Sequence, residues 1–161
     1  MASFELHSRN LAQEQVAHTH DFHQLILATC GVTELSMEGQ GERVTARRGC
    51  LIPASRHHEY QGDGSNRTLV LDIPVAQLAS LEKGSEIERL FDKPRFFSVP
   101  PALNQLTHAL ANQLEQCPAL QNEIAILLLR ALTMYLHDAT PAAVGQLGQH
   151  CISERLDLAR L

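Results

Sequence analysis

Three histidines and one glutamine are spaced in this sequence as the ligands of a single metal ion would be. His18, His20 and Gln24 stand at positions i, i+2 and i+6, which on one β-strand point to the same face. His58 follows some forty residues later, on or beside another predicted strand. If both strands line one barrel, three imidazoles and an amide converge inside it, and imidazole suits Zn²⁺, Ni²⁺, Mn²⁺ and Fe²⁺. These residues therefore predict a site for one divalent transition metal.

Two other interpretations of the same residues stay open. The histidines could form a polar lining, hydrogen-bonded to one another or to water. In an enzyme they would make a facial metal site for oxygenase or isomerase chemistry, but such iron sites usually need two histidines and a carboxylate. Position 24 is a glutamine, and Asp21 and Glu59 are expected to face outward. The same alternation predicts that His23 and His57 are exposed, and catalysis is the less favoured interpretation.

Short strands must position these side chains. Residues 1–74 contain alternating polar and apolar runs, divided by turn clusters such as Glu38-Gly-Gln-Gly41. Regular spacing of this kind is typical of an antiparallel sandwich or barrel. Two short helical stretches are predicted over 75–92, and then a strand from Arg95 to Val99 that returns to the sheet. We expect a β-barrel domain over residues 1–99.

Two helices are predicted after the barrel. Pro100-Pro101 opens the first, whose leucines at 103, 106, 110 and 114 follow a helical spacing. Pro118 opens the second, which runs to about His137 and is apolar around nearly its whole circumference. A helix that is hydrophobic on all sides is buried on all sides, so something must cover the side that the barrel leaves open.

A second copy of the chain is the predicted cover, although a third element of the same chain could also supply it. Residues 100–141 are therefore the predicted homodimerisation region. The expected contacts are Ile124, Leu127, Leu128, Ala131 and Tyr135. Residues 142–161 form a looser amphipathic segment in which Asp157 is placed as the N-cap of a helix. We expect a linker here and the truncated start of a further domain.

Composition narrows the function. The 161 residues hold 13 Lys+Arg against 18 Asp+Glu, a formal net charge of −5, without a basic block, so the chain should not hold DNA by itself. No apolar run approaches the ~20 residues that span a bilayer, and the start does not resemble a signal peptide; we expect no membrane contact. Four widely spaced cysteines predict reduced thiols in a cytoplasmic protein.

The histidine run resembles the first motif of the cupin family. His18-x-His20-x₃-Gln24-x₆-Gly31 is similar to H-x-H-x₃₋₄-E-x₆-G, with Gln in place of Glu. The segment Pro53-x-Ser55-x-x-His58 is similar to the second motif, P-x-G-x-x-H, with Ser in place of Gly. The edges of both motifs depart from the pattern: Ala12 replaces the opening Gly, and Gly62 replaces the closing Asn.

The order of features along the chain narrows the resemblance further. A degenerate cupin, an Arg95-Phe-Phe strand and two leucine-rich helices resemble the N-terminal sensor and dimerisation half of AraC-type transcription regulators, and Ile152 to Leu161 is similar to the start of that family's helix-turn-helix domain. The resemblance implies a cupin jelly-roll barrel that receives a small effector, a pair of antiparallel helices that join two subunits, and DNA contact only through a missing C-terminal domain. It also makes Phe22, Ile26 and Tyr60 walls of the effector pocket. The alternative is a stand-alone metal-dependent cupin enzyme.

Overall fold

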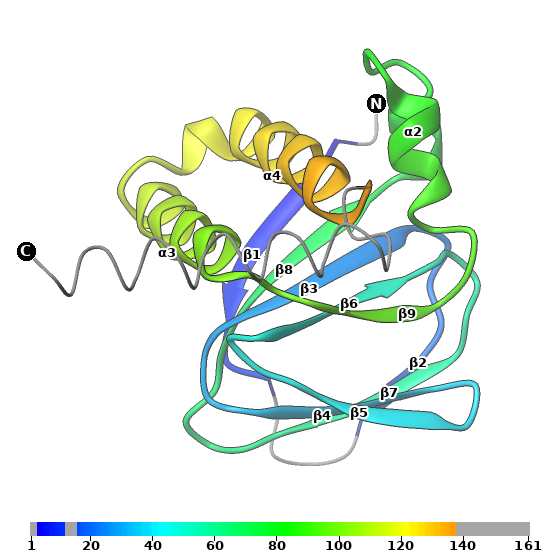
Figure 1. Ribbon diagram of the computed structural model, residues 1–161, viewed down its shortest axis with the longest axis vertical. Coiled ribbons are helices and arrows are strands. Elements are labelled where there is room, and N and C mark those ends of the chain that lie inside the picture. Colours follow the sequence, from blue (N-terminus) through cyan, green and yellow to red (C-terminus); the bar gives the residue numbers. More distant parts are fainter. Residues whose placement is uncertain (1–2, 12–15, 138–161) are drawn as a thin grey trace, which may run out of the picture.

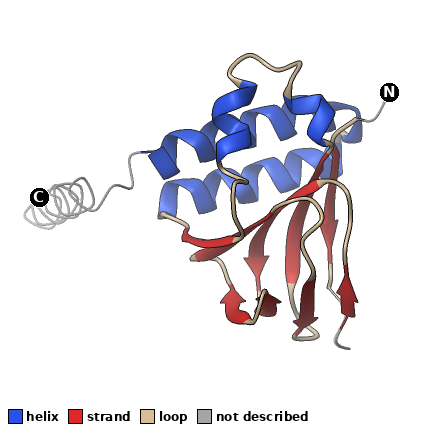
Figure 2. Ribbon diagram, turned by 90° about the vertical axis from the view of Figure 1, so that its right-hand side faces the viewer, coloured by secondary structure: helices blue, strands red, loops and turns tan. Residues whose placement is uncertain are grey.

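The computed structural model describes residues 3–11 and 16–137. Within these ranges, nine strands form two antiparallel sheets, and the helices gather on one side of the first sheet (Figure 1; Figure 2). The predicted fold class, a β-barrel followed by a pair of helices, is confirmed. The predicted linker and helix start over 142–161 lie outside the described residues.

The first sheet lies between the helices and the second sheet. Its strands, in spatial order, are β1 (Glu5–Arg9), β8 (Arg67–Ile73), β3 (His23–Cys30), β6 (Arg48–Ile52) and β9 (Arg95–Ser98). Leu25 and Leu27 of the central strand β3 pack with the helices, whereas Ile26 and Ala28 pack toward the second sheet. Burial on both faces explains why β3 reads as a nearly continuous apolar run.

The second sheet has one buried face and one face in solvent. Its strands, in spatial order, are β2 (Val16–His18), β7 (His58–Gly62), β4 (Thr33–Met37) and β5 (Gln40–Val44). Leu35 and Met37 of β4 are buried inside the barrel, while Glu34 between Thr33 and Leu35 is exposed. The polar and apolar alternation of β4 follows from this arrangement.

Prolines set the helix boundaries as the sequence predicts. The helical elements are α1 (Val75–Leu78), α2 (Gly84–Arg89), α3 (Pro101–Gln116), the 3₁₀ turn η1 (Pro118–Leu120) and α4 (Gln121–His137). Pro101 opens α3, because its fixed φ suits the first helical position. Cys117 leaves the helical region with φ −142°, since the residue before a proline avoids it. The strand predicted to return to the sheet is β9, which pairs with β6.

Helix α4 is buried on one side only. Its inward residues, among them Ala125, Leu128, Leu129 and Leu132, join a core with the first sheet and the other helices. Leu127 is 48% exposed and Met134 is 70% exposed. The expectation that this helix is covered all round therefore does not hold within one chain. Leu127 and Met134, which are seven residues apart, thus form an exposed apolar stripe on the outer side of α4.

The stretch Pro118–Leu136 also corrects the expectation about apolar runs. Its 19 residues have a mean hydropathy of 1.2, enough by length and composition to cross a membrane. Its inward face is nevertheless part of the protein core, and the core helices of folded domains can reach the same length and hydropathy. Length and composition are thus weak grounds for a membrane span here.

Candidate functional site

Three of the predicted ligands meet at one end of the second sheet. His18 is the last residue of β2, and His58, the first of β7, stands opposite it in the strand register. His20 follows in the turn after β2. The centroid of the His58 ring lies 4.6 Å from that of His18 and 4.8 Å from that of His20. One nitrogen from each ring lies within 4.8 Å of the others, and we call these three residues the histidine trio.

Backbone carbonyls determine which ring nitrogens carry hydrogen. His20 Nδ1 is 2.8 Å from the carbonyl oxygen of Phe22, and His58 Nδ1 is 3.2 Å from that of Arg56. Because a carbonyl can only accept, each Nδ1–H is the donor and each neutral ring keeps a lone pair on Nε2. Histidines that bind metals are commonly oriented by a bond of this kind on the other nitrogen.

Those lone pairs have no partner. The Nε2 atoms of His20 and His58 are buried, and within the described part of the chain neither has a hydrogen-bond partner. His58 as a whole is fully buried. Most buried polar atoms in proteins are paired, since an unpaired one costs about 1 to 3 kcal/mol. Among the residues that the structure describes, no group engages these two nitrogens.

Burial keeps two members of the trio, His58 and His18, neutral. The pKa of His58 is lowered to about 4, and burial is the largest cause; the hydrogen bond to the Arg56 carbonyl raises it, and the nearby His20 and His18 rings lower it. The pKa of His18 is lowered as well, first by burial and then by His20. At neutral pH the rings of His58 and His18 are thus in the unprotonated form that binds a metal ion.

Aromatic side chains surround the trio. The Phe22 ring stacks on His20, with 4.0 Å between centroids and 2° between planes. Tyr60 meets His18 edge-on at 5.2 Å. Ile26 lies deeper, in the inner cluster of the barrel, and Tyr60 packs against that cluster. Phe22 and Tyr60 thus contact the trio directly, and Tyr60 links it to the inner cluster that contains Ile26.

Gln24 is not part of the trio. The chain leaves β2 at His18, bends through residues 19–22, and enters β3 of the other sheet at His23. Gln24 therefore lies on the opposite sheet, where its Nε2 donates to Asp72 Oδ1 at 2.7 Å. The prediction that His18, His20 and Gln24 share one strand face is wrong, because they do not share a strand.

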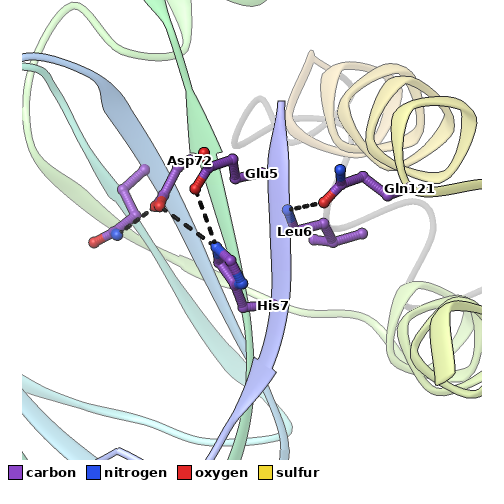
Figure 3. A network of polar contacts seen from close by, with 6 residues as sticks. Glu5, Leu6, His7, Asp72 and Gln121 are labelled. Carbon is purple, nitrogen blue, oxygen red and sulfur yellow. Dashed lines mark hydrogen bonds and ion pairs between the residues drawn. The ribbon is translucent and has the colours of Figure 1, made fainter. Parts of the chain in front are cut away.

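A second group with ligand atoms, Glu5, His7 and Asp72, was missed by the sequence reasoning. Glu5 and Asp72 face each other in the β1–β8 register, and His7 Nε2 lies 3.5 Å from Glu5 Oε2 and 4.0 Å from Asp72 Oδ2 (Figure 3). The only local signal is the Glu5-x-His7 spacing. Glu5 is exposed and His7 is half-buried, with side-chain exposures of 63% and 36%.

This second group faces the second sheet from across the barrel. Leu6 and Leu71, which alternate with Glu5 and Asp72, pack with the helices, so the polar residues point the other way. Strand β1 is also tied to the helices, because the Leu6 N–H donates to Gln121 Oε1 at 3.1 Å (Figure 3). Two polar groups thus line the barrel from opposite sheets.

Two histidines near the trio in sequence, His57 and His23, differ in burial. His57 is exposed, as the alternation predicts. His23 is only 6% exposed, so the prediction for it is wrong. Its ring is held between the Ala54 N–H and Glu88 and stacks on Phe91 of the helical insert. The face of β3 on which His23 stands is covered by helices, and a strand pattern read locally does not show this.

The predicted dimer contacts fall into three sets by burial. Ile124 and Leu128 are 4% and 0% exposed within the chain's own core, so they offer no surface to a partner. Ala131 and Tyr135 are half-buried, and Tyr135 packs against the core. Leu127 is the one predicted contact among the five that is exposed on α4. The side of α4 predicted to contact a second subunit packs instead against the first sheet and the neighbouring helices.

A hollow of about 470 Å³ lies along β4, β5 and β7 of the second sheet. Its lining includes Glu34, Arg43 and Glu42. Arg43 pairs with Glu34 at 3.5 Å, and Glu42 pairs with Arg48 at 2.7 Å. These charges are already matched, and the lining contains no member of the trio.

Comparisons with known proteins place these features in context. Residues 2–137 match the model of the AraC-like ligand binding domain family. The probable transcriptional regulator LumQ of Photobacterium leiognathi is 25% identical over 132 residues, which are 78% of this chain and 50% of LumQ. The chain thus spans about half the length of this relative.

Solved structures agree on the fold. Unsaturated fatty acid-bound ToxT from Vibrio cholerae superposes with a TM-score of 0.56 at 13% identity, over 83% of this chain and 55% of ToxT. The AraC-like transcriptional activator CuxR has a TM-score of 0.56 at 9% identity, over 82% of this chain and 51% of CuxR. At these identities the likeness concerns the architecture alone.

Proposed function

The chain belongs to the AraC-like ligand binding domain family, and from this membership we propose that it is the effector-sensing part of a cytoplasmic transcription regulator. In this proposal the histidine trio holds one divalent transition metal. The observation that carries the metal is the pair of buried Nε2 lone pairs, on His20 and His58, that lack a partner in the described chain. A binding function is favoured over catalysis, because the ligand-capable cluster around the trio contains three histidines and no carboxylate in the ranges described.

The residues present fit a metal ion. Neutral imidazole nitrogens suit the later first-row metals, and the ligand atoms lie within 4.8 Å of one another. Two nitrogens bound to zinc at tetrahedral angles would be about 3.3 Å apart, so small ring movements are needed. A bound ion would satisfy the buried lone pairs. Three protein ligands would leave a coordination position for a donor atom of the effector.

The effector is proposed to be a small molecule with one polar head and an apolar body. Its head would approach the trio, and its body would lie against Phe22, Tyr60 and Ile26, which join the trio to the apolar interior. ToxT structures contain an unsaturated fatty acid or (E)-4-(8-methylnaphthalen-1-yl)but-3-enoic acid, both of which fit this description. Apolar walls with a few convergent polar groups are the usual composition of such sites.

Self-association belongs to the same proposal. Residues 1–99 would sense the effector, and 100–141 would pair two subunits through the exposed stripe of α4, which includes Leu127 and Met134. DNA contact is assigned to protein outside these 161 residues, because a net charge of −5 gives this chain a poor surface for phosphates.

Metal analysis tests the proposed site. After dialysis against zinc, the wild-type chain should retain about one ion, and the His18→Ala/His20→Ala variant should retain almost none. His57→Ala is the matched control, since His57 is exposed and outside the trio. Less than about a tenth of an ion per wild-type chain would refute the metal site.

A further inference from the structure

A bent segment, residues 54–56, is bonded to two members of the histidine trio. The Ser55 N–H donates to the backbone carbonyl of His20 at 2.7 Å, and the Arg56 carbonyl accepts the Nδ1–H of His58 at 3.2 Å. Ser55 has φ 64°, in the left-handed region that a non-glycine residue adopts only at some cost. Surrounding bonds must therefore hold this segment in its conformation, and two of them come from the trio.

The third member of the segment is held by His23. The Ala54 N–H donates to His23 Nδ1 at 2.9 Å, so the proton of the neutral His23 ring is on Nε2. That Nε2–H donates to Glu88 Oε1 at 3.1 Å. The ring also stacks on Phe91, with centroids 4.6 Å apart and an interplanar angle of 11°. His23 thus joins the segment to helix α2 and the residues that follow it.

Helix α2 in turn packs against α4. Ile87 and Phe91 are buried in the same core cluster as Leu128 and Leu129 of α4, and the two helices are in contact. A displacement of α2 would therefore change its packing against α4, the helix that carries the exposed apolar stripe. In the bonded path from trio to helix, each donor lies 2.7 to 3.2 Å from its acceptor.

We propose that His23 couples occupancy of the histidine trio to helix α2, through residues 54–56. The proposal rests on the proposed function, since it takes the trio as the binding site. Engagement of the free Nε2 atoms draws the rings of His20 and His58 together. Because both residues are bonded to residues 54–56, that segment must adjust, and His23 carries the adjustment to Glu88 and Phe91. A neutral histidine suits position 23, because its Nδ1 accepts from the Ala54 N–H while its Nε2–H donates to Glu88.

Hydrogen exchange with zinc alone as the ligand tests the coupling. Amide exchange of the 161-residue chain is followed by mass spectrometry with and without Zn²⁺, and zinc stoichiometry is measured on the same samples. In the wild type, zinc should slow exchange roughly threefold or more both around residues 54–58 and across α2 to Phe91. If His23 had only a structural role, replacing it would change amide exchange equally with and without zinc. The zinc-dependent difference in exchange is therefore the relevant readout.

Two substitutions separate the two bonds of His23. In His23→Asn the amide oxygen can still accept from the Ala54 N–H, but nothing reaches Glu88. In His23→Gln the longer amide can still donate to Glu88, but the acceptor for Ala54 is lost. Both variants should bind zinc within about tenfold of wild type, because His23 is outside the trio. In both, the zinc-dependent slowing should be absent from α2, and His23→Asn should keep it around residues 54–58.

Glu88 gives a matched pair that is safe for folding, since its side chain is 43% exposed. Glu88→Ala removes the acceptor and should abolish the slowing in α2. Glu88→Gln retains an oxygen acceptor and should restore it. Zinc binding to the wild type without any change in α2 would overturn the coupling and leave the metal site standing. The same conclusion would follow if the His23 variants or Glu88→Ala showed the wild-type slowing of amide exchange in α2 on addition of zinc. A wild type that binds no zinc would overturn both.

Discussion

His18 and His58 face each other across the β2–β7 ladder, with ring centroids 4.6 Å apart and ring planes at 84°. Because β2 is short and ends at His18, this contact is among the last on the edge of the second sheet. A ligand that bridges the two rings would fasten this edge strand to its neighbour. The consequences can be measured as changes in stability.

Zinc should stabilise the wild-type chain. A ligand that binds only the folded state adds RT ln(1 + [L]/Kd), about 2.7 kcal/mol at a hundredfold excess over Kd. The midpoint of thermal unfolding should therefore rise with zinc and fall again with a chelator. His20→Ala should show almost no rise, whereas His57→Ala should behave as wild type. An equal rise in His20→Ala would place the ion elsewhere.

Metal-free protein should lose stability as the pH falls from about 6.5 to about 4. Burial lowers the pKa of His58 to about 4, so in this range the unfolded chain binds a proton there that the folded chain does not. Unfolding is then favoured by acid, by an amount on the order of 3 kcal/mol. Urea unfolding at a series of pH values measures the slope. His58→Asn should have a shallower slope than wild type, and identical slopes would contradict the assignment.

Gln24→Glu, which restores the glutamate of the cupin motif, should not strengthen zinc binding. Gln24 lies on the opposite sheet and donates to Asp72, so a glutamate there replaces a hydrogen bond by a repulsion between two carboxylates. We expect a loss of about 1 to 3 kcal/mol at pH 7, and a zinc affinity within about threefold of wild type. Calorimetric titration and urea unfolding test the two parts. A gain of tenfold or more in affinity would show that residue 24 is a ligand.

Neighbouring leucines on α4 should respond in opposite ways. Leu128 is fully buried, so Leu128→Ala should cost about 2 to 5 kcal/mol of folding free energy. Leu127 is 48% exposed, so Leu127→Glu should leave the fold intact and weaken self-association. Sedimentation at micromolar concentration measures the second effect, with the exposed Gln61→Glu on β7 as a control. A monomeric wild type would refute the dimer, and an unaffected Leu127→Glu dimer would exclude this stripe.

The sequence by itself determined the element types and their order. Turn clusters and strand alternation predict the barrel, and the prolines at 101 and 118 predict where the two helices begin. These features depend on local backbone preferences and on the period of apolar residues, which a linear chain displays directly. The spacing of His18 and His20, with the later His58, was also enough to propose the trio that the structure brings together.

Only the tertiary structure decided which side chains share a site. The crossing between sheets at residues 19–22 places Gln24 and His18 on different sheets, although they are close in sequence. The pairing of β1 with β8 brings Glu5 beside Asp72, and helix α2 covers His23. Local periodicity specifies that a face is apolar or polar, but strand pairing and helix packing between distant segments decide what that face meets.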